Sequence, residues 1–282
     1  MELTMIEHKK FANGFEYIEV SNVVSSAKIS LQGAHIFEYK CSGETLIWLS
    51  EASDFEYGKA IRGGVPLCWP RFGSIDKTLP QHGFARTEMF EFVSSTEIDE
   101  ETTELIFRLK ENSNTLKIWN YKFVLELKIT LGQTLTMELT TTNVDTQSYM
   151  ITQALHSYFP VSHISEAEVV GLDGKPYVDA VDGKTKLQRG AIVFNAEVNR
   201  VYQEVKDSLL LVDKNRTIRV KNSGSNSVVV WNPAKENCHN MSAFNDDSYE
   251  TFVCIESSNA FDDTITLEPN ASHTLKAVID TF

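Results

Sequence analysis

An alternation of apolar and other residues with a period of two is the feature that most constrains how this chain folds. In residues 123–129 (FVLELKI) the first, third, fifth and seventh positions are apolar, and residues 135–139 (LTMEL) repeat the pattern after the sequence LGQT. Successive side chains of a β-strand point to opposite faces of its sheet, so this pattern is typical of strands buried on one face. The two segments are therefore predicted to form a hairpin around a turn that contains Gly132.

Similar short patterns recur along the chain. They predict strand, turn and strand in 208–222, a strand in 225–233 that a proline ends, and strands in 251–257 and 273–280. Shorter candidate strands are residues 15–20, 27–31, 45–49, 90–95 and 104–110. Short helical turns at 51–58 and 240–247 are the only helical structure expected. Many short strands at roughly even spacing, without a linker or a repeat, predict an all-β sandwich or barrel forming one domain over residues 1–282.

The composition limits where such a domain works and what it binds. The formal net charge of −13 argues against general binding to nucleic acid or to anionic membranes. No run of about 18 uncharged apolar residues predicts a membrane span, and the N-terminal sequence MELTMIEHKK has no apolar core of a signal peptide. The cysteines form no CxxC pair, so reduced thiols in the cytoplasm are expected at Cys41, Cys68, Cys238 and Cys254.

One segment of this acidic chain is locally cationic. Residues 59–86 read KAIRGGVPLCWPRFGSIDKTLPQHGFAR and contain a single acid, Asp76, beside five cations: Lys59, Arg62, Arg71, Lys77 and Arg86. Glycine, proline and aromatic residues interrupt the strand pattern here, which is typical of irregular loops packed into a functional site. A structural loop that caps one end of the sandwich is the alternative.

Two segments carry residues suited to acid–base chemistry. In 151–161 (ITQALHSYFPV) the alternation places His156 on the face opposite Leu155 and Phe159, and histidine can exchange a proton near neutral pH. In 252–257 (FVCIES) Glu256 shares a face with Phe252 and Cys254, where burial would raise its pKa toward that of a general base. A half-buried structural histidine, and a glutamate at a strand end that has reached solvent, remain the alternatives.

Taken together, these segments resemble a known family. The order of IRGGVPLCWPRFG, PQHGFAR, ALHSYF, VWNP and FVCIES, from about Gly33 to the final strands, is similar to that of hexose-6-phosphate mutarotases. These enzymes are also called glucose-6-phosphate 1-epimerases and are relatives of the aldose 1-epimerases. The resemblance implies a β-supersandwich of the galactose-mutarotase type that interconverts the α and β anomers of a hexose 6-phosphate, with no metal or cofactor.

The resemblance also implies roles for individual residues. Glu256 would be the base that removes the C1 hydroxyl proton, and His156 the acid that protonates the ring oxygen. Substrate binding would fall to Arg62, Gln81, His82, Arg86 and Asn199. The arginines would hold a phosphate that is close to a dianion at pH 7. Trp69 and Phe72 could stack on the sugar or fill the core, and Lys59, Arg71 and Lys77 are expected on the solvated surface.

One residue departs from the family pattern, and other functions stay open. Asn199, in 196–205 (AEVNRVYQEV), stands where the family often has an aspartate that accepts hydrogen bonds from sugar hydroxyls, and Asp207 lies outside the matching motif. A non-catalytic phosphosugar-binding protein is therefore the main alternative. A glycosidase would need two facing carboxylates, and a jelly-roll metalloenzyme a compact histidine spacing. The oligomeric state is open, with a slight preference for a monomer.

Overall fold

The alternating segments form a large antiparallel sheet. The computed structural model describes residues 4–74 and 78–282. Within them, a nine-stranded sheet contains, in spatial order, β17 (Ile192–Val193), β14 (Glu168–Val170), β19 (Leu209–Asp213), β20 (Arg216–Ser223), β24 (Ser272–Thr281), β10 (Leu135–Asn143), β9 (Phe123–Leu131), β8 (Thr102–Lys110) and β7 (Glu91–Asp99). Every second residue of β9 and β10 is buried, and Leu131 pairs with Leu135, which confirms the predicted hairpin.

Two further large sheets complete the strands of the sandwich. A five-stranded sheet contains β1 (Met5–Lys10), β2 (Glu16–Ser21), β3 (Ser25–Ser30), β4 (His35–Cys41) and β5 (Glu44–Thr45). An eight-stranded sheet contains β16 (Lys184–Leu187), β15 (Pro176–Asp179), β18 (Val198–Tyr202), β21 (Ser227–Asn232), β22 (Phe252–Asn259), β12 (Gln153–Leu155) and β6 (Leu67–Cys68), and β13 (Tyr158–Pro160) pairs with the other end of β22.

Short elements connect these sheets. The strands β11 (Tyr149–Ile151) and β23 (Ile265–Leu267) form a small sheet of their own. The helical elements among the described residues are α1 (Thr115–Ile118), α2 (Ala234–Asn240) and the 3₁₀ turns η1 (Ala85–Thr87), η2 (Ile164–Glu166), η3 (Ser248–Thr251) and η4 (Phe261–Asp263). No helix within residues 4–74 and 78–282 has the length and hydropathy needed to cross a membrane.

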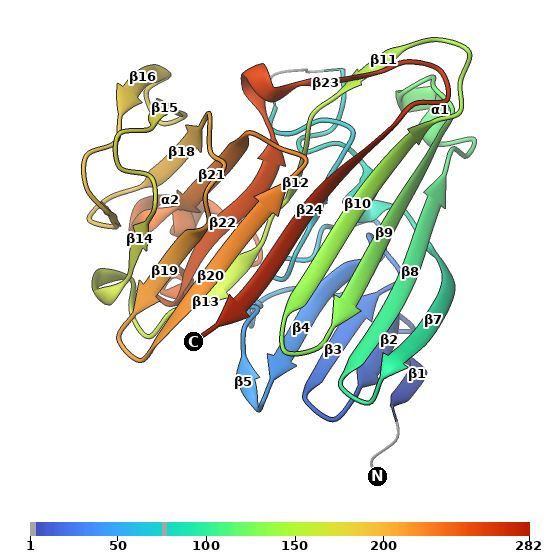
Figure 1. Ribbon diagram of the computed structural model, residues 1–282, viewed down its shortest axis with the longest axis horizontal. Helices are drawn as coiled ribbons and strands as arrows, with labels where there is room; N and C mark the ends of the chain where they lie inside the picture. Colours follow the sequence, from blue (N-terminus) through green and yellow to red (C-terminus); the bar gives the residue numbers. More distant parts are fainter. Residues whose placement is uncertain (1–3, 75–77) are drawn as a thin grey trace.

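The sheets pack face to face around one apolar core. The long strands β24, β10, β9 and β8 of the nine-stranded sheet lie in front of β3 and β4 in Figure 1, and β19 and β20 lie in front of β21 and β22. Contacts of β3 with β9, and of β22 with β20 and β24, join the layers. The shared core contains Ile29, Leu127, Leu139, Ile255 and Leu275, all fully buried. The predicted all-β sandwich is therefore confirmed.

Some local predictions were wrong. Of the expected strand 45–49, only Thr45 belongs to a strand, β5, and Leu49 forms an isolated bridge with Gly63. Residues 51–58 form turns rather than a helical turn. The helical turn expected at 240–247 lies earlier, as α2, and η3 follows it. In each of these segments the pattern of polar and apolar residues resembles that of a strand or a helical turn. The backbone nevertheless does not form the hydrogen bonds of that element over the predicted range.

The strand β22 is buried on both faces, which sets it apart from β9 and β10. All eight of its residues are buried. Val253 and Ile255 point into the shared core, whereas Phe252 and Cys254 pack with Tyr158 on the other side of the sheet. Because Glu256 follows the alternation, its carboxylate lies on that second side, as the sequence pattern predicted.

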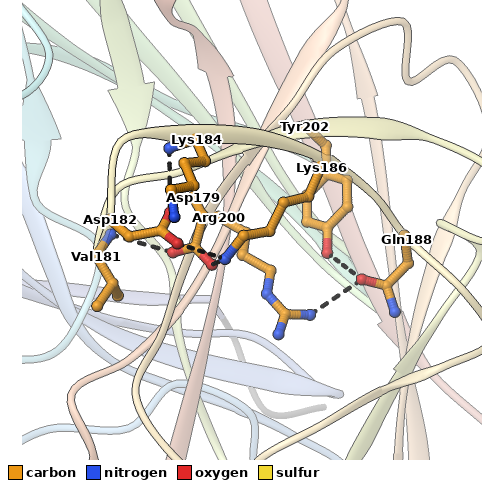
Figure 2. Close-up of polar contacts among 8 residues, drawn as sticks. All are labelled: Asp179, Val181, Asp182, Lys184, Lys186, Gln188, Arg200 and Tyr202. Carbon is orange, nitrogen blue, oxygen red and sulfur yellow. Dashed lines mark hydrogen bonds and ion pairs between the residues drawn. The ribbon is translucent and has the colours of Figure 1, made fainter.

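A polar network holds the edge of the eight-stranded sheet (Figure 2). Lys186 pairs with Asp179 at 2.7 Å and with Asp182 at 2.9 Å across the β15–β16 hairpin. Gln188 Oε1 accepts hydrogen bonds from Arg200 at 3.0 Å and from Tyr202 at 2.7 Å. Arg200 and Tyr202 alternate along β18 with Asn199, so these contacts secure the position of the strand from the face opposite that residue.

Gly83 allows two loops to meet. It has φ +69° and forms a parallel bridge with Trp69, and a Cβ atom at this position would lie 2.1 Å from the Trp69 carbonyl oxygen. Trp69 itself is fully buried, and its indole donates to Thr141 at 2.9 Å. Only glycine fits this contact, so the motif PQHGFAR is held against the segment that follows IRGG.

We predict that Gly83→Ala destabilises the fold far more than Gly183→Ala. Both glycines have nearly the same φ, +69° and +71°, but nothing lies within 4 Å of a Cβ at Gly183. The left-handed backbone costs either alanine about 1–2 kcal/mol, and the contact with Trp69 adds about 1–3 kcal/mol at Gly83 alone. Denaturant unfolding of both variants measures the difference, and equal losses would show that the close contact is unimportant.

Candidate active site

The predicted site residues lie around one pocket. A cavity of about 470 Å³ on the second side of the eight-stranded sheet is lined by all seven of them: Arg62, Gln81, His82, Arg86, His156, Asn199 and Glu256. They come from loops before and after β6, from the β12–β13 junction, and from β18 and β22. Residues that are almost 200 positions apart in the chain therefore face the same space.

His156 and Glu256 meet where the sheet is interrupted. β12 pairs with β22 up to Leu155 and Ser257, and β13 resumes the pairing at Tyr158 and Cys254. The two residues left between β12 and β13 include His156, whose backbone N–H donates to the Pro66 carbonyl at 3.1 Å. The gap turns the imidazole toward β22, and His156 Nε2 lies 3.3 Å from Glu256 Oε1.

The pair is almost completely removed from solvent. The side chains of His156 and Glu256 are 11% and 2% exposed. Burial raises the pKa of Glu256 well above its usual range, because a carboxylate loses its hydration there. Burial, with contributions from His82, Arg86 and Arg62, lowers the pKa of His156 well below its usual value. A single proton shared between the two groups keeps the pair neutral overall.

Aromatic side chains fix the imidazole. The Tyr158 ring is stacked on His156 with centroids 4.9 Å apart and planes 13° apart, and the Trp231 ring meets its edge at 5.8 Å. His82 approaches from the other loop at 5.8 Å. Tyr158 and Trp231 belong to the motifs ALHSYF and VWNP, but the sequence alone assigned neither of them a role.

Histidines 35 and 82 have different surroundings. His35 is buried, and its Nε2 lies 2.9 Å from the Gly63 carbonyl. Burial lowers the pKa of His35 to about 3, so it anchors the IRGG loop as a neutral donor.

His82 Nδ1 accepts a hydrogen bond from the Gly73 N–H at 3.3 Å. Burial and the charges of Arg86 and Arg62 lower the pKa of His82 to about 3. A neutral His82 that accepts at Nδ1 carries its proton on Nε2 and can donate it to a ligand.

Two guanidiniums supply positive charge to the pocket. Arg62 lies 5.1 Å from the centroid of the Phe244 ring, and its buried Nε has no hydrogen-bond partner among the described residues. Arg86 donates to the Gln81 carbonyl at 2.7 Å. These contacts involve a ring and a backbone oxygen rather than carboxylates. Within the described part of the chain, the two charges are therefore available to an anion.

Two of the other cations of segment 59–86, Lys59 and Arg71, do not line this pocket. Lys59 is exposed and pairs with Glu56 at 2.7 Å, and Arg71 donates to the carbonyls of Pro70 and Met150. Lys77 lies outside the described residues. Of the two aromatic residues left open, Trp69 fills the core and Phe72 lines the pocket.

Several residues that line the pocket were not predicted from the sequence. Glu197 precedes β18, and Asn237, Asn240 and Met241 come from α2 and the residue after it. Glu197 could have been found, because it lies two residues before Asn199 and so shares its face. The α2 residues could not, since no periodic pattern connects them with β18.

A second hollow of about 510 Å³ lacks comparable groups. It lies beside Glu44, Asp213 and Arg216. Arg216 is already bound, since it donates to the carbonyls of Thr45 at 2.7 Å and Pro160 at 2.8 Å. We therefore assign the candidate site to the pocket around His156 and Glu256.

Comparison with known proteins agrees with the fold. A crystal structure from Salmonella typhimurium, described as that of a "putative mutarotase", superposes with a TM-score of 0.91 at 33% identity and covers 98% of this chain and 93% of that one. A galactose mutarotase-like protein from Lactobacillus casei gives a TM-score of 0.74 at 15% identity over 94% of this chain and all of that one, and so supports the fold alone.

Relatives in sequence cover nearly the whole chain. A protein of Escherichia coli K12 named "Putative glucose-6-phosphate 1-epimerase" is 33% identical over 98% of this chain and 94% of its own length. A protein of the same name from Cenchrus ciliaris is 36% identical over 86% of this chain and 77% of its own. The family model for aldose 1-epimerase matches residues 16–280. The chain therefore belongs to the aldose 1-epimerase family.

Proposed function

We propose that this protein is an isomerase that interconverts the α and β anomers of a hexose 6-phosphate, with glucose 6-phosphate as the first candidate. The observation that carries the proposal is the buried contact between His156 and Glu256, 3.3 Å apart, in a pocket that also presents Arg62 and Arg86. Family membership supports an epimerase, and the curated relatives carry the name of the glucose-6-phosphate enzyme.

The reaction requires two proton transfers around one carbon. Glu256 accepts the proton of the C1 hydroxyl, and the electron pair left on that oxygen forms the carbonyl as the bond from C1 to the ring oxygen breaks. His156 donates a proton to the ring oxygen. After rotation about C1–C2, the two residues exchange roles and the ring closes on the other face. Both reacting oxygens are bonded to C1, so two groups as close together as this pair can reach them.

The proton shared by the pair suits this cycle. Ring opening requires this proton on His156 and leaves it on Glu256, which is the arrangement that the raised pKa of Glu256 and the lowered pKa of His156 favour. Burial disfavours an isolated charge on either group, but opposite charges 3.3 Å apart offset part of that cost. Both arrangements are neutral overall, so the cycle never leaves a net charge on the pair.

The arginines favour a phosphorylated sugar. A guanidinium offers forked donors that match phosphate oxygens. The net charge of −13 would repel a sugar phosphate from most of the surface, so a local cationic site is needed to attract it. We place the reaction in the cytoplasm, where sugar phosphates are found and where four buried, unpaired cysteines would stay reduced.

Substitution of the pair tests the mechanism. We expect His156→Asn and Glu256→Gln each to slow the anomerisation of glucose 6-phosphate about 10²-fold or more, measured by NMR exchange between the anomers. The matched controls are His163→Asn and Glu250→Gln, because these residues form an exposed pair 3.6 Å apart. Unchanged rates in the first two variants would rule out the mechanism. Tight sugar-phosphate binding without exchange in the wild-type protein would favour the non-catalytic alternative.

Substitution of the arginines tests the substrate class. A hydrogen bond to a charged group contributes about 1.5–3 kcal/mol, so Arg62→Ala and Arg86→Ala should each reduce kcat/KM for glucose 6-phosphate about 10- to 100-fold. The value for unphosphorylated glucose should change little. Arg189→Ala, an exposed position outside the pocket, is the control. Equal losses with both sugars would show that the arginines do not bind the phosphate.

The pH dependence of stability tests the burial of Glu256. Its folded pKa is raised above the unfolded value of 4.5, so its stabilising contribution is complete below that pH and is lost as the pH rises through the folded pKa. The melting temperature of Glu256→Gln minus that of the wild type should therefore increase as the pH rises from 4.5 to 7. The exposed Glu97→Gln serves as the reference. A constant difference would mean that the raised pKa is absent.

A further inference from the structure

One wall of the pocket has no part in the acid–base mechanism. It is built from the start of β18 and from α2, and it presents the polar side chains of Glu197, Asn199, Asn237 and Asn240. The sequence resemblance drew attention only to Asn199, as a position without the carboxylate that the family often has. The structure shows that a carboxylate is nevertheless present in this wall.

Strand geometry explains why Glu197 faces the pocket. Asn199 pairs with Trp231 across β18 and β21, and both side chains line the cavity. Glu197 precedes Asn199 by two residues, so the alternation of side chains brings it to the same face. Val198, between them, points into the shared core.

The Glu197 carboxylate is held but not neutralised. Asn237 Nδ2 donates to its Oε2 at 2.6 Å, and no cation of the described residues forms an ion pair with it. Its other oxygen accepts no hydrogen bond from those residues. Partial burial raises its pKa, so loss of hydration is the main influence on this group. A carboxylate in this state gains from a ligand that donates hydrogen bonds to it.

The side chain of the neighbouring Asn199 is also free to bind a ligand. Its backbone carbonyl accepts from Ala180 and its backbone pairs with that of Trp231, but its side-chain amide has no hydrogen-bond partner among the described residues. An amide offers both a donor and an acceptor, whereas a carboxylate offers acceptors alone. Vicinal hydroxyls of a sugar can donate to the carboxylate and bond to the amide at the same time.

The charges of the pocket also orient such a ligand. A phosphate dianion is attracted by Arg62 and Arg86 and repelled by Glu197. We infer that Glu197 is a specificity-determining residue that binds a ring hydroxyl of the sugar, while the phosphate lies at the arginines. This inference rests on the proposed function. Glu197 supplies the acceptor charge that Asn199 lacks, from a position two residues earlier in the chain.

The test combines Glu197→Gln with substrates that each lack one hydroxyl. Glutamine keeps an acceptor for Asn237, but it removes the charge and replaces one acceptor oxygen with an amide donor. With glucose 6-phosphate, kcat/KM should fall about 10- to 100-fold, mainly through KM, because a charge-assisted hydrogen bond is lost. With one of the 2-, 3- and 4-deoxy analogues, variant and wild type should be equal, since the hydroxyl bound by Glu197 is missing.

The controls separate a binding role from a structural one. Asn237→Ala removes the donor that holds Glu197, and comparison of its melting temperature with that of Glu197→Gln reports whether the contact mainly supports α2. If Glu197→Gln leaves kcat/KM for glucose 6-phosphate unchanged, or lowers it equally for every analogue, the inference is wrong. If the wild type exchanges no anomers, the proposed function fails instead. The same substrate panel, measured as affinities by calorimetry, then decides the role of Glu197 by the same comparison.

Discussion

The removal of Glu256 from water is the constraint on which the rest of the site depends. A carboxylate on a strand that is buried on both faces is costly unless a partner or a proton compensates it. The compensation comes from His156, 3.3 Å away, which itself is held by stacking on Tyr158. The gap between β12 and β13 is therefore essential, because continuous pairing along β22 would not turn the imidazole toward the carboxylate.

The eight-stranded sheet has two different faces. One face contributes Val253, Ile255 and Val230 to the apolar core of the sandwich, and the other contributes Glu256, Trp231 and Asn199 to the pocket. The packing of the first face in the core supports the geometry of the second. At its edge, the network around Gln188 in Figure 2 secures β18 in the same way.

The pocket contains charged groups of both signs. Arg62 and Arg86 contribute positive charge, and Glu197 contributes a carboxylate that is held by Asn237. A ligand with an anionic end and a hydroxylated end matches this distribution, which is the property that distinguishes a sugar phosphate from a free sugar or an inorganic anion. The net charge of −13 repels an anionic ligand from the protein as a whole, so attraction of such a ligand depends on local cations such as these two guanidiniums.

Local patterns in the sequence determined the strands and the face of each side chain. The hairpin of β9 and β10 and the inward direction of Glu256 follow from a period of two, which depends only on neighbouring residues. The resemblance to a family then named all seven predicted residues that line the pocket, but it attached no role to Glu197, Trp231 or Tyr158. Only the tertiary structure decided that Trp69 belongs to the core, that the sheet is interrupted at His156, and that α2 brings Asn237 to Glu197. These features arise from contacts between distant segments, and no local pattern encodes such contacts.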